Sequence, residues 1–195
     1  NRPPSRDWGA PGQHDGNNNQ SSKIEKFIQV KGIYPNKGFE SLTSAPENRN
    51  IVFTANEHSI VQDSKNKSFQ QSLNGLVRIT KIDKNLKTNI EYLYQLDEIA
   101  NNGLVELVAL NAKKLLVLER AYLPQLNKVI AKIYSINLED ANAKMPVSKK
   151  LVLDLEQIRM SLPEGFKIID NIEGMTLGPK LADGKGTLIL VSDNN

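Results

Sequence analysis

The stretch LVELVALNAKKLLVLERAYLPQLNKVIAKIYSIN (104–137) contains three apolar runs, separated from one another by short polar segments. The runs are short and rich in Val, Ile and Leu, which favours β-strands over helices. Helical periodicity is weak and is confined to 155–162 and 123–134, and the latter fits a loop followed by a strand equally well. Similar short runs fill the chain from residue 23 onward, so the sequence predicts an all-β fold.

The order of strands recurs along the chain. Glu106 lies near the head of its run, as do Glu40 in GFESLT (38–43) and Glu173 in NIEGMTL (171–177). The three acids are 66 and 67 positions apart, counted from 40 to 106 and from 106 to 173. A second apolar run follows each of them and ends in an acid, at Glu57, Glu119 and Asp193.

Two further runs complete the unit. Residues 76–83 correspond to 129–137, residues 90–99 correspond to 150–158, and 23–33 resemble the last strand of a preceding unit. A four-stranded unit that recurs in this way indicates the blades of a β-propeller. A β-sandwich is the alternative, but it does not predict an acid at the same place in every unit.

We therefore expect one domain over residues 23–195, preceded by a polar tail, 1–22, that is rich in Pro, Gly, Asn, Gln and Ser. The expected parts of a partial propeller, about two whole and two incomplete blades, are the end of one blade (23–37), two four-stranded blades (38–100 and 101–160) and an incomplete blade (161–195). The chain does not start with Met, so we expect a processed product or an excerpt of a longer protein.

Composition excludes several classes of protein. The net charge of +3 is too small to indicate nucleic-acid binding, and no apolar run is long enough for a membrane span. The chain has no Cys, which excludes disulfides, thiolate zinc sites and a Cys nucleophile. GPKLADGKGT (178–187) fits a hairpin turn better than a phosphate loop, and Lys113–Lys114 and Lys149–Lys150 are expected at solvated strand edges. Oligomeric state is left open.

The recurring acids are the candidate site. Glu40, Glu106 and Glu173 share a strand face with the apolar residue two positions on, so each is expected at the mouth of a central channel. Clustered carboxylates repel one another, and either raised pKa values or a cation resolves this. Calcium suits an oxygen-rich site, and its candidate ligands are Glu40, Glu57, Glu106, Glu119, Glu173 and Asp193. The alternative is that these acids accept backbone N–H bonds at strand ends.

Two other side chains adjoin these acids. His58 follows Glu57 and is expected either to face the channel or to lie in a solvated loop. Arg120 follows Glu119 and is expected to pair with a neighbouring acid or with a phosphate oxygen.

The chain resembles the bacterial phytase-like family, described as having esterase-like activity, over about residues 23–195. The segments that carry the resemblance are NKGFESLT (36–43), YLYQLDEI (92–99), LLVLER (115–120), KLVLDLEQI (150–158), NIEGMTLGP (171–179) and TLILVSDNN (187–195). Glu106 stands where the family usually has Asp. The resemblance implies a β-propeller, further blades before residue 1, about one more strand after residue 195, and an extracellular or periplasmic location.

The resemblance also implies a metal-assisted hydrolase of small-molecule phosphoesters or other esters. In such a hydrolase the recurring acids would bind Ca²⁺, and Arg120, Asn194 and His58 would bind the substrate. The alternative function is a non-catalytic, exported propeller that binds a glycan, a lipid or a protein. In that case the acids would hold calcium ions that only stabilise the blades.

Overall fold

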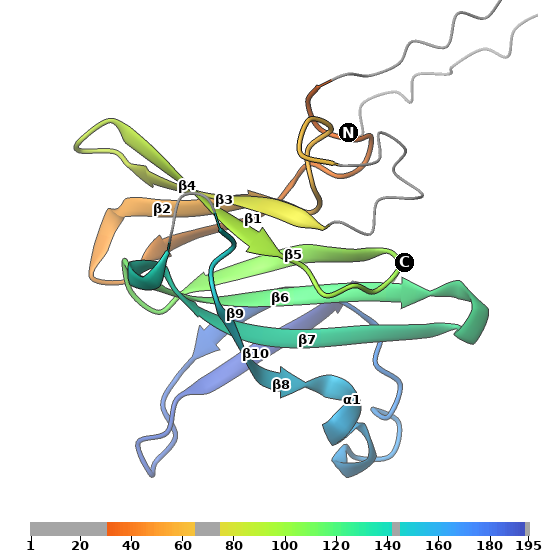
Figure 1. The fold of residues 1–195 in the computed structure, drawn as a ribbon. Helices are drawn as coiled ribbons and strands as arrows, with labels where there is room; N and C mark the ends of the chain where they lie inside the picture. The colour runs from red at the N-terminus through yellow and green to blue at the C-terminus, as the bar shows by residue number, and fades with distance from the viewer. Residues whose placement is uncertain (1–30, 65–74, 142–144, 194–195) are drawn as a thin grey trace, which may run out of the picture.

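The computed structural model describes residues 31–64, 75–141 and 145–193, and it is built of antiparallel sheets (Figure 1). The first sheet contains β1 (Phe39–Ala45), β2 (Asn48–Asn56), β3 (Leu76–Asp83) and β4 (Thr88–Gln95). The second contains β5 (Asn102–Ala109), β6 (Lys114–Leu123), β7 (Lys128–Asn137) and β8 (Lys149–Asp154). The third contains β9 (Asn171–Gly178) and β10 (Thr187–Asp193). The predicted all-β class is confirmed.

Helical structure is short. The helix α1 (Leu155–Ile158) directly follows β8, and Asp154 caps it by accepting a hydrogen bond from the Glu156 N–H at 3.0 Å. A 3₁₀ turn (Arg159–Ser161) continues it. The weak helical pattern over 155–162 therefore corresponds to one short helix and one 3₁₀ turn. A 3₁₀ turn (Pro124–Leu126) and then β7 occupy the second weak pattern, which makes it a loop followed by a strand.

The strands of each four-stranded sheet pair in chain order. The predicted correspondences are present: the runs at 76–83 and 129–137 form the third strands, and the first parts of the runs at 90–99 and 150–158 form the fourth, which end at Gln95 and Asp154. The GPKLADGKGT segment connects β9 to β10, as predicted for a hairpin. The predicted tail, 1–22, lies outside the described residues. The segment 23–33 was expected to end a preceding blade. Its residues 23–30 also lie outside the described residues, and residues 31–33 are not in a strand.

The register shifts once beside each of the three recurring acids. At each shift, one residue of the first strand has no partner on the second strand. These residues are Glu40 in β1, Val105 in β5 and Glu173 in β9. A β-bulge of this kind bends the strand and re-aims side chains. Glu106 is not the bulged residue, because it pairs with Leu118. Glu40 and Glu173 thus occupy the bulged position of their strands, whereas Glu106 does not.

In the second sheet, strands β5 and β6 are buried on both faces. Its side toward the first sheet packs Leu107, Leu115 and Val117 against Phe53 and Ile79. Because the residues of a strand alternate between faces, Leu116 and Leu118 point the other way. There they belong to a second cluster of buried residues, which includes Met175 of β9. Burial on both faces explains why β5 and β6 are apolar runs with little polar alternation.

The first strands of the three sheets lie side by side, with β5 in contact with both β1 and β9 (Figure 1). The sheets do not close into a barrel in the described part of the chain. Three sheets in succession, each placing its first strand against the next, differ from the two facing sheets of a β-sandwich. Among the described residues, no helix is long or apolar enough to cross a membrane.

Candidate functional site

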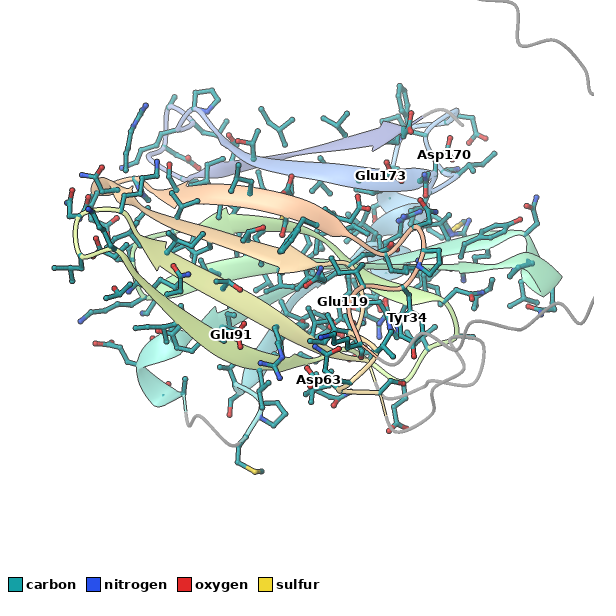
Figure 2. All side chains as sticks on the ribbon, turned by 90° about the horizontal axis from the view of Figure 1, so that it is seen from above. Tyr34, Asp63, Glu91, Glu119, Asp170 and Glu173 are labelled. Atoms are coloured by element: carbon teal, nitrogen blue, oxygen red, sulfur yellow. The ribbon has the colours of Figure 1, made fainter. Side chains whose placement is uncertain are left out.

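The predicted acids lie at one end of the sheets. The starts of β1, β5 and β9 pair with the ends of β2, β6 and β10, so both sets of acids come to the same end. The β6–β7 connection and α1 are found at that end as well (Figure 1). Figure 2 shows Asp170 and Glu173 together at this end of β9.

Charged side chains from all three sheets meet there. We name them the inner-strand cluster, and its members are Lys37, Glu40, Glu57, Arg120, Asn171 and Glu173. Lys37 Nζ lies 2.7 Å from Glu57 Oε1. Arg120 Nη2 lies 3.3 Å from Glu173 Oε1, and Arg120 also donates to the side-chain oxygen of Asn171. Asn171 in turn donates to Glu173 at 2.7 Å. The predicted pairing of Arg120 with a neighbouring acid is confirmed.

Glu40, a member of this cluster, has an altered proton affinity. Partial burial raises the pKa of Glu40, and the nearby carboxylates of Glu57 and Glu173 raise it further. Lys37 and Arg120 oppose this effect without cancelling it. Glu40 is therefore protonated over a wider pH range than an ordinary glutamate, as a proton donor requires.

A close approach of the backbone allows the first and second sheets to meet here. Glu57 lies over Gly103 of β5, where a Cβ atom would come within 2.7 Å of Glu57 Cγ and 2.8 Å of Glu57 Oε1. The backbone N–H of Leu104 also donates to the carbonyl oxygen of Glu57 at 2.8 Å. Only glycine at position 103 leaves room for the Glu57 carboxylate in this position. Gly103 pairs with Arg120 of the neighbouring strand β6, so Glu57 lies one strand away from Arg120.

Glu106 lies apart from this cluster. Its carboxylate accepts hydrogen bonds from the backbone N–H groups of Leu107, at 2.8 Å, and of Met175. Burial raises the pKa of Glu106, and these two hydrogen bonds oppose the rise. Of the two roles considered from the sequence, its geometry fits the backbone acceptor: Glu106 ties β5 to β9.

The side chain of Glu119 lies on the face of β6 opposite to that of Arg120, and it belongs to a second set of polar residues. We name this set the Lys149 network, and its members are Tyr94, Asp97, Asn102, Glu119, Lys132, Tyr134 and Lys149. Glu119 is 2% exposed. It accepts hydrogen bonds from Tyr94 Oη and Lys149 Nζ, both at 2.6 Å, and from Asn102 Nδ2, at 2.6 Å. It also accepts one from the Asp97 N–H at 3.0 Å.

The position of Lys149 differs from the prediction. It was expected at a solvated strand edge, but its ammonium lies between two carboxylates, 2.6 Å from Glu119 Oε1 and 2.7 Å from Asp97 Oδ1. It also lies 5.2 Å from the ring centre of Tyr94 and 4.3 Å from that of Tyr134, as in a cation–π contact. The ammonium of Lys149 thus neutralises an acid that the sequence had suggested for calcium.

The lowered pKa of Asp97 predicts that the free energy of unfolding depends on pH. Burial alone would raise its pKa, but hydrogen bonds from Lys149, Tyr134 and Lys132 lower it to about 2. The folded pKa lies below the unfolded value of 3.8, so this contribution is complete above pH 4 and is lost as the pH falls toward 2. We expect roughly 1–2 kcal/mol of unfolding free energy to be lost over that range, measured by urea denaturation. An Asp97→Asn variant should lack this part of the acid dependence, and equal acid sensitivity in both proteins would contradict the assignment.

The remaining predicted residues lie near the inner-strand cluster or beyond the described part of the chain. His58 is buried rather than in a solvated loop, and burial and the charge of Lys37 lower its pKa to about 4. It is therefore neutral at neutral pH. Asp193 ends β10 and is exposed, opposite Asn171. Asn194 lies outside the described residues.

The candidate calcium ligands do not gather into one group in the described residues. Within 31–64, 75–141 and 145–193, no three His, Cys, Asp or Glu side chains lie close enough to share a metal ion. Lys37, Arg120 and Lys149 each contact one of the candidate acids, and backbone N–H groups contact Glu106. These contacts do not fit Ca²⁺, which needs six to eight oxygen ligands free to turn toward it.

Sequence reasoning missed four of the residues that shape these sites: Lys37, Gly103, Asn171 and Asp97. None of them recurs at the spacing of the acids, and spacing was the signal used. Several of their partners lie far away in the sequence: Lys37 and Glu57 are 20 positions apart, and Arg120 and Asn171 are 51 positions apart. The packing of one sheet on the next creates these contacts.

Comparison with known proteins gives one match. The model of a family described as "Phytase-like: Esterase-like activity of phytase" matches residues 9–195. No curated protein and no solved structure matches the chain. Since the match covers nearly the whole chain, the protein belongs to the phytase-like family.

Proposed function

We propose that the protein is an ester hydrolase of the propeller type, acting on small phosphoesters or related esters at the inner-strand cluster. The phytase-like family suggests a hydrolase-type function. The adjacent first strands β1, β5 and β9 support the propeller arrangement, in which such strands surround a central channel. One observation carries the proposal: Glu40, whose pKa is raised, lies at the start of β1 near two cationic side chains, Lys37 just before β1 and Arg120 of β6 in the second sheet.

The cations would bind the anionic part of the substrate. Arg120 presents a planar guanidinium, which suits phosphate and carboxylate oxygens. Its side chain is 18% exposed, so part of the group is accessible to a ligand. Lys37 adds a second positive charge near Glu40, since both cations lower the pKa of Glu40.

Glu40 would act as the general acid. Water attacks the phosphorus or the acyl carbon, the ester bond breaks, and Glu40 gives its proton to the departing oxygen. The proton of the attacking water passes to Glu173, which is half-exposed and can exchange it with solvent. Arg120 would stabilise the negative charge that develops on the oxygens of the transition state.

Binding of inorganic phosphate tests this part of the proposal. We expect phosphate to raise the melting temperature of the protein in a saturable way, because a ligand that binds only the native state stabilises it. Arg120→Gln should abolish the rise, whereas Arg49→Gln, an exposed arginine in the β1–β2 hairpin region, should leave it intact. An unchanged rise in the Arg120 variant would exclude the cluster as the anion site.

Calcium ligation, predicted from the sequence, is a separate question. Because Lys37 and Arg120 already neutralise Glu57 and Glu173, we expect melting curves with Ca²⁺ and with a chelator to coincide within about 1 °C. A large rise with Ca²⁺ that Glu40→Gln abolishes would instead place a cation in the cluster. It would contradict the anion-binding role of Lys37 and Arg120.

The binding module is the second candidate function, and the ion pairs of Lys149 with Glu119 and Asp97 support a structural role for these two acids. Turnover separates the two. A hydrolase releases phosphate or p-nitrophenol from p-nitrophenyl esters, and a binding module releases neither. The export implied by the family resemblance is part of the proposal under either function.

A further inference from the structure

A groove lies beside α1, between this helix and the segment that leads into β9. Two adjoining cavities form it, of about 480 and 220 Å³, and both are lined by Ile168 and Ile169. We name the pair the α1 groove. Asp170 lines the larger cavity and lies at the same end of β9 as Glu173 (Figure 2).

The larger cavity is lined almost entirely by apolar side chains. Leu155 and Ile172 form its inner wall and belong to the core between the second and third sheets. Leu162 and Phe166 form part of its lining as well. Phe166 is 69% exposed and Ile168 is 85% exposed. Large apolar side chains exposed around a cavity of small-molecule size indicate a ligand with an apolar part.

The smaller cavity is positively charged. Its lining includes Lys128, Arg159 and Lys167 but only one carboxylate, Glu156. Lys128 Nζ lies 3.0 Å and Arg159 Nε 3.2 Å from Glu156, so two cations share a single carboxylate. Lys167 pairs outward with the highly exposed Glu164 at 2.7 Å.

The charges are therefore arranged along the groove. Asp170, the carboxylate of the larger cavity, does not line the smaller one, and it accepts a hydrogen bond from the Asn171 N–H at 2.8 Å. A ligand with an apolar tail and an anionic head matches both cavities: the tail removes apolar surface from water, and the head meets the excess of cations.

We infer that the α1 groove binds a single-chain carboxylate, with the chain in the larger cavity and the carboxylate beside Lys128 and Arg159. This site is distinct from the inner-strand cluster, and none of its contacts involves Arg120 or Glu40. The inference therefore stands whether or not the protein hydrolyses esters.

Calorimetric titration with sodium decanoate, below its micelle concentration, tests the inference. Decanoate should bind saturably, and octanoate about tenfold more weakly, because each methylene that leaves water contributes about 0.8 kcal/mol. Decyltrimethylammonium has an alkyl chain one carbon longer and a positive head, and it should bind at least tenfold more weakly than decanoate.

Two pairs of variants locate the site. Phe166→Asp should weaken decanoate binding at least tenfold, while Leu86→Asp should not, although Leu86 is equally exposed at 70% in the turn between β3 and β4. Arg159→Gln should weaken decanoate binding severalfold without weakening that of decyltrimethylammonium. Arg49→Gln should change neither. Because Phe166 is largely exposed, its replacement leaves the core intact.

Several outcomes would overturn the inference. Absence of decanoate binding, or binding unaffected by Phe166→Asp, would exclude the groove. Equal binding of decanoate and decyltrimethylammonium would show a non-selective apolar surface. A dimer that Phe166→Asp dissociates, seen by sedimentation without any added ligand, would show that a second copy of the chain covers the groove.

Discussion

Replacing Lys149 by methionine is expected to lower the unfolding free energy by about 3–5 kcal/mol, because two carboxylates then lose the ammonium between them. Glu119 is nearly inaccessible to solvent, so its charge cannot be hydrated instead. Tyr94 and Asn102 would still donate to Glu119, but neutral donors do not balance a buried charge. Urea denaturation at pH 7 measures the loss.

The chain offers a close control for this change. Lys150 is the next residue of β8, and it is exposed. Lys150→Met should therefore change stability by no more than about 0.5 kcal/mol. Adding Glu119→Gln to Lys149→Met removes the stranded charge and should restore part of the loss. If Lys149→Met and Lys150→Met were equally mild, the network would not hold the first and second sheets together.

The second large effect concerns turnover. Glu40→Gln should lower kcat for p-nitrophenyl phosphate by about 10²- to 10⁴-fold, the range expected when a general acid is lost. Because Glu40 is largely exposed, the substitution should leave the melting temperature nearly unchanged. This combination separates a chemical role from a structural one.

Glu91→Gln is the matched control for Glu40. Glu91 is a half-exposed glutamate on β4 that pairs with Arg78, away from the inner-strand cluster. Its loss should leave kcat within about twofold of the original protein. Equal losses of activity in the two variants would show that the assay responds to something other than the cluster.

Much of the fold could be predicted from the sequence because strand signals are local. Apolar alternation and turn residues identified the strands, and the spacing of Glu40, Glu106 and Glu173 identified the equivalent first strands. Arg120 was also recognised as a partner of a neighbouring acid, now seen to be Glu173. These inferences needed only the periodicity of a strand and the length of one repeat.

What could not be predicted depends on contacts between sheets. The position of a β-bulge changes where adjacent side chains point, and beside the bulge at Val105 the carboxylate of Glu106 accepts a backbone hydrogen bond. Lys149 meets Asp97 across 52 positions and Glu119 across 30, counted from 97 and 119 to 149. A lysine beside a strand has the sequence signature of a solvated edge until the neighbouring sheet is placed.

The pH–rate profile of the wild-type protein and of Glu40→Gln, measured side by side on p-nitrophenyl phosphate, tests the central claim most directly. The account predicts that wild-type turnover falls as the pH rises and Glu40 loses its proton. Because burial and neighbouring carboxylates raise the pKa of Glu40, this fall should begin above the ordinary titration range of a glutamate. Glu40→Gln should show low turnover without that fall. Equal rates with the same profile in both proteins would contradict the account and remove Glu40 from the chemistry.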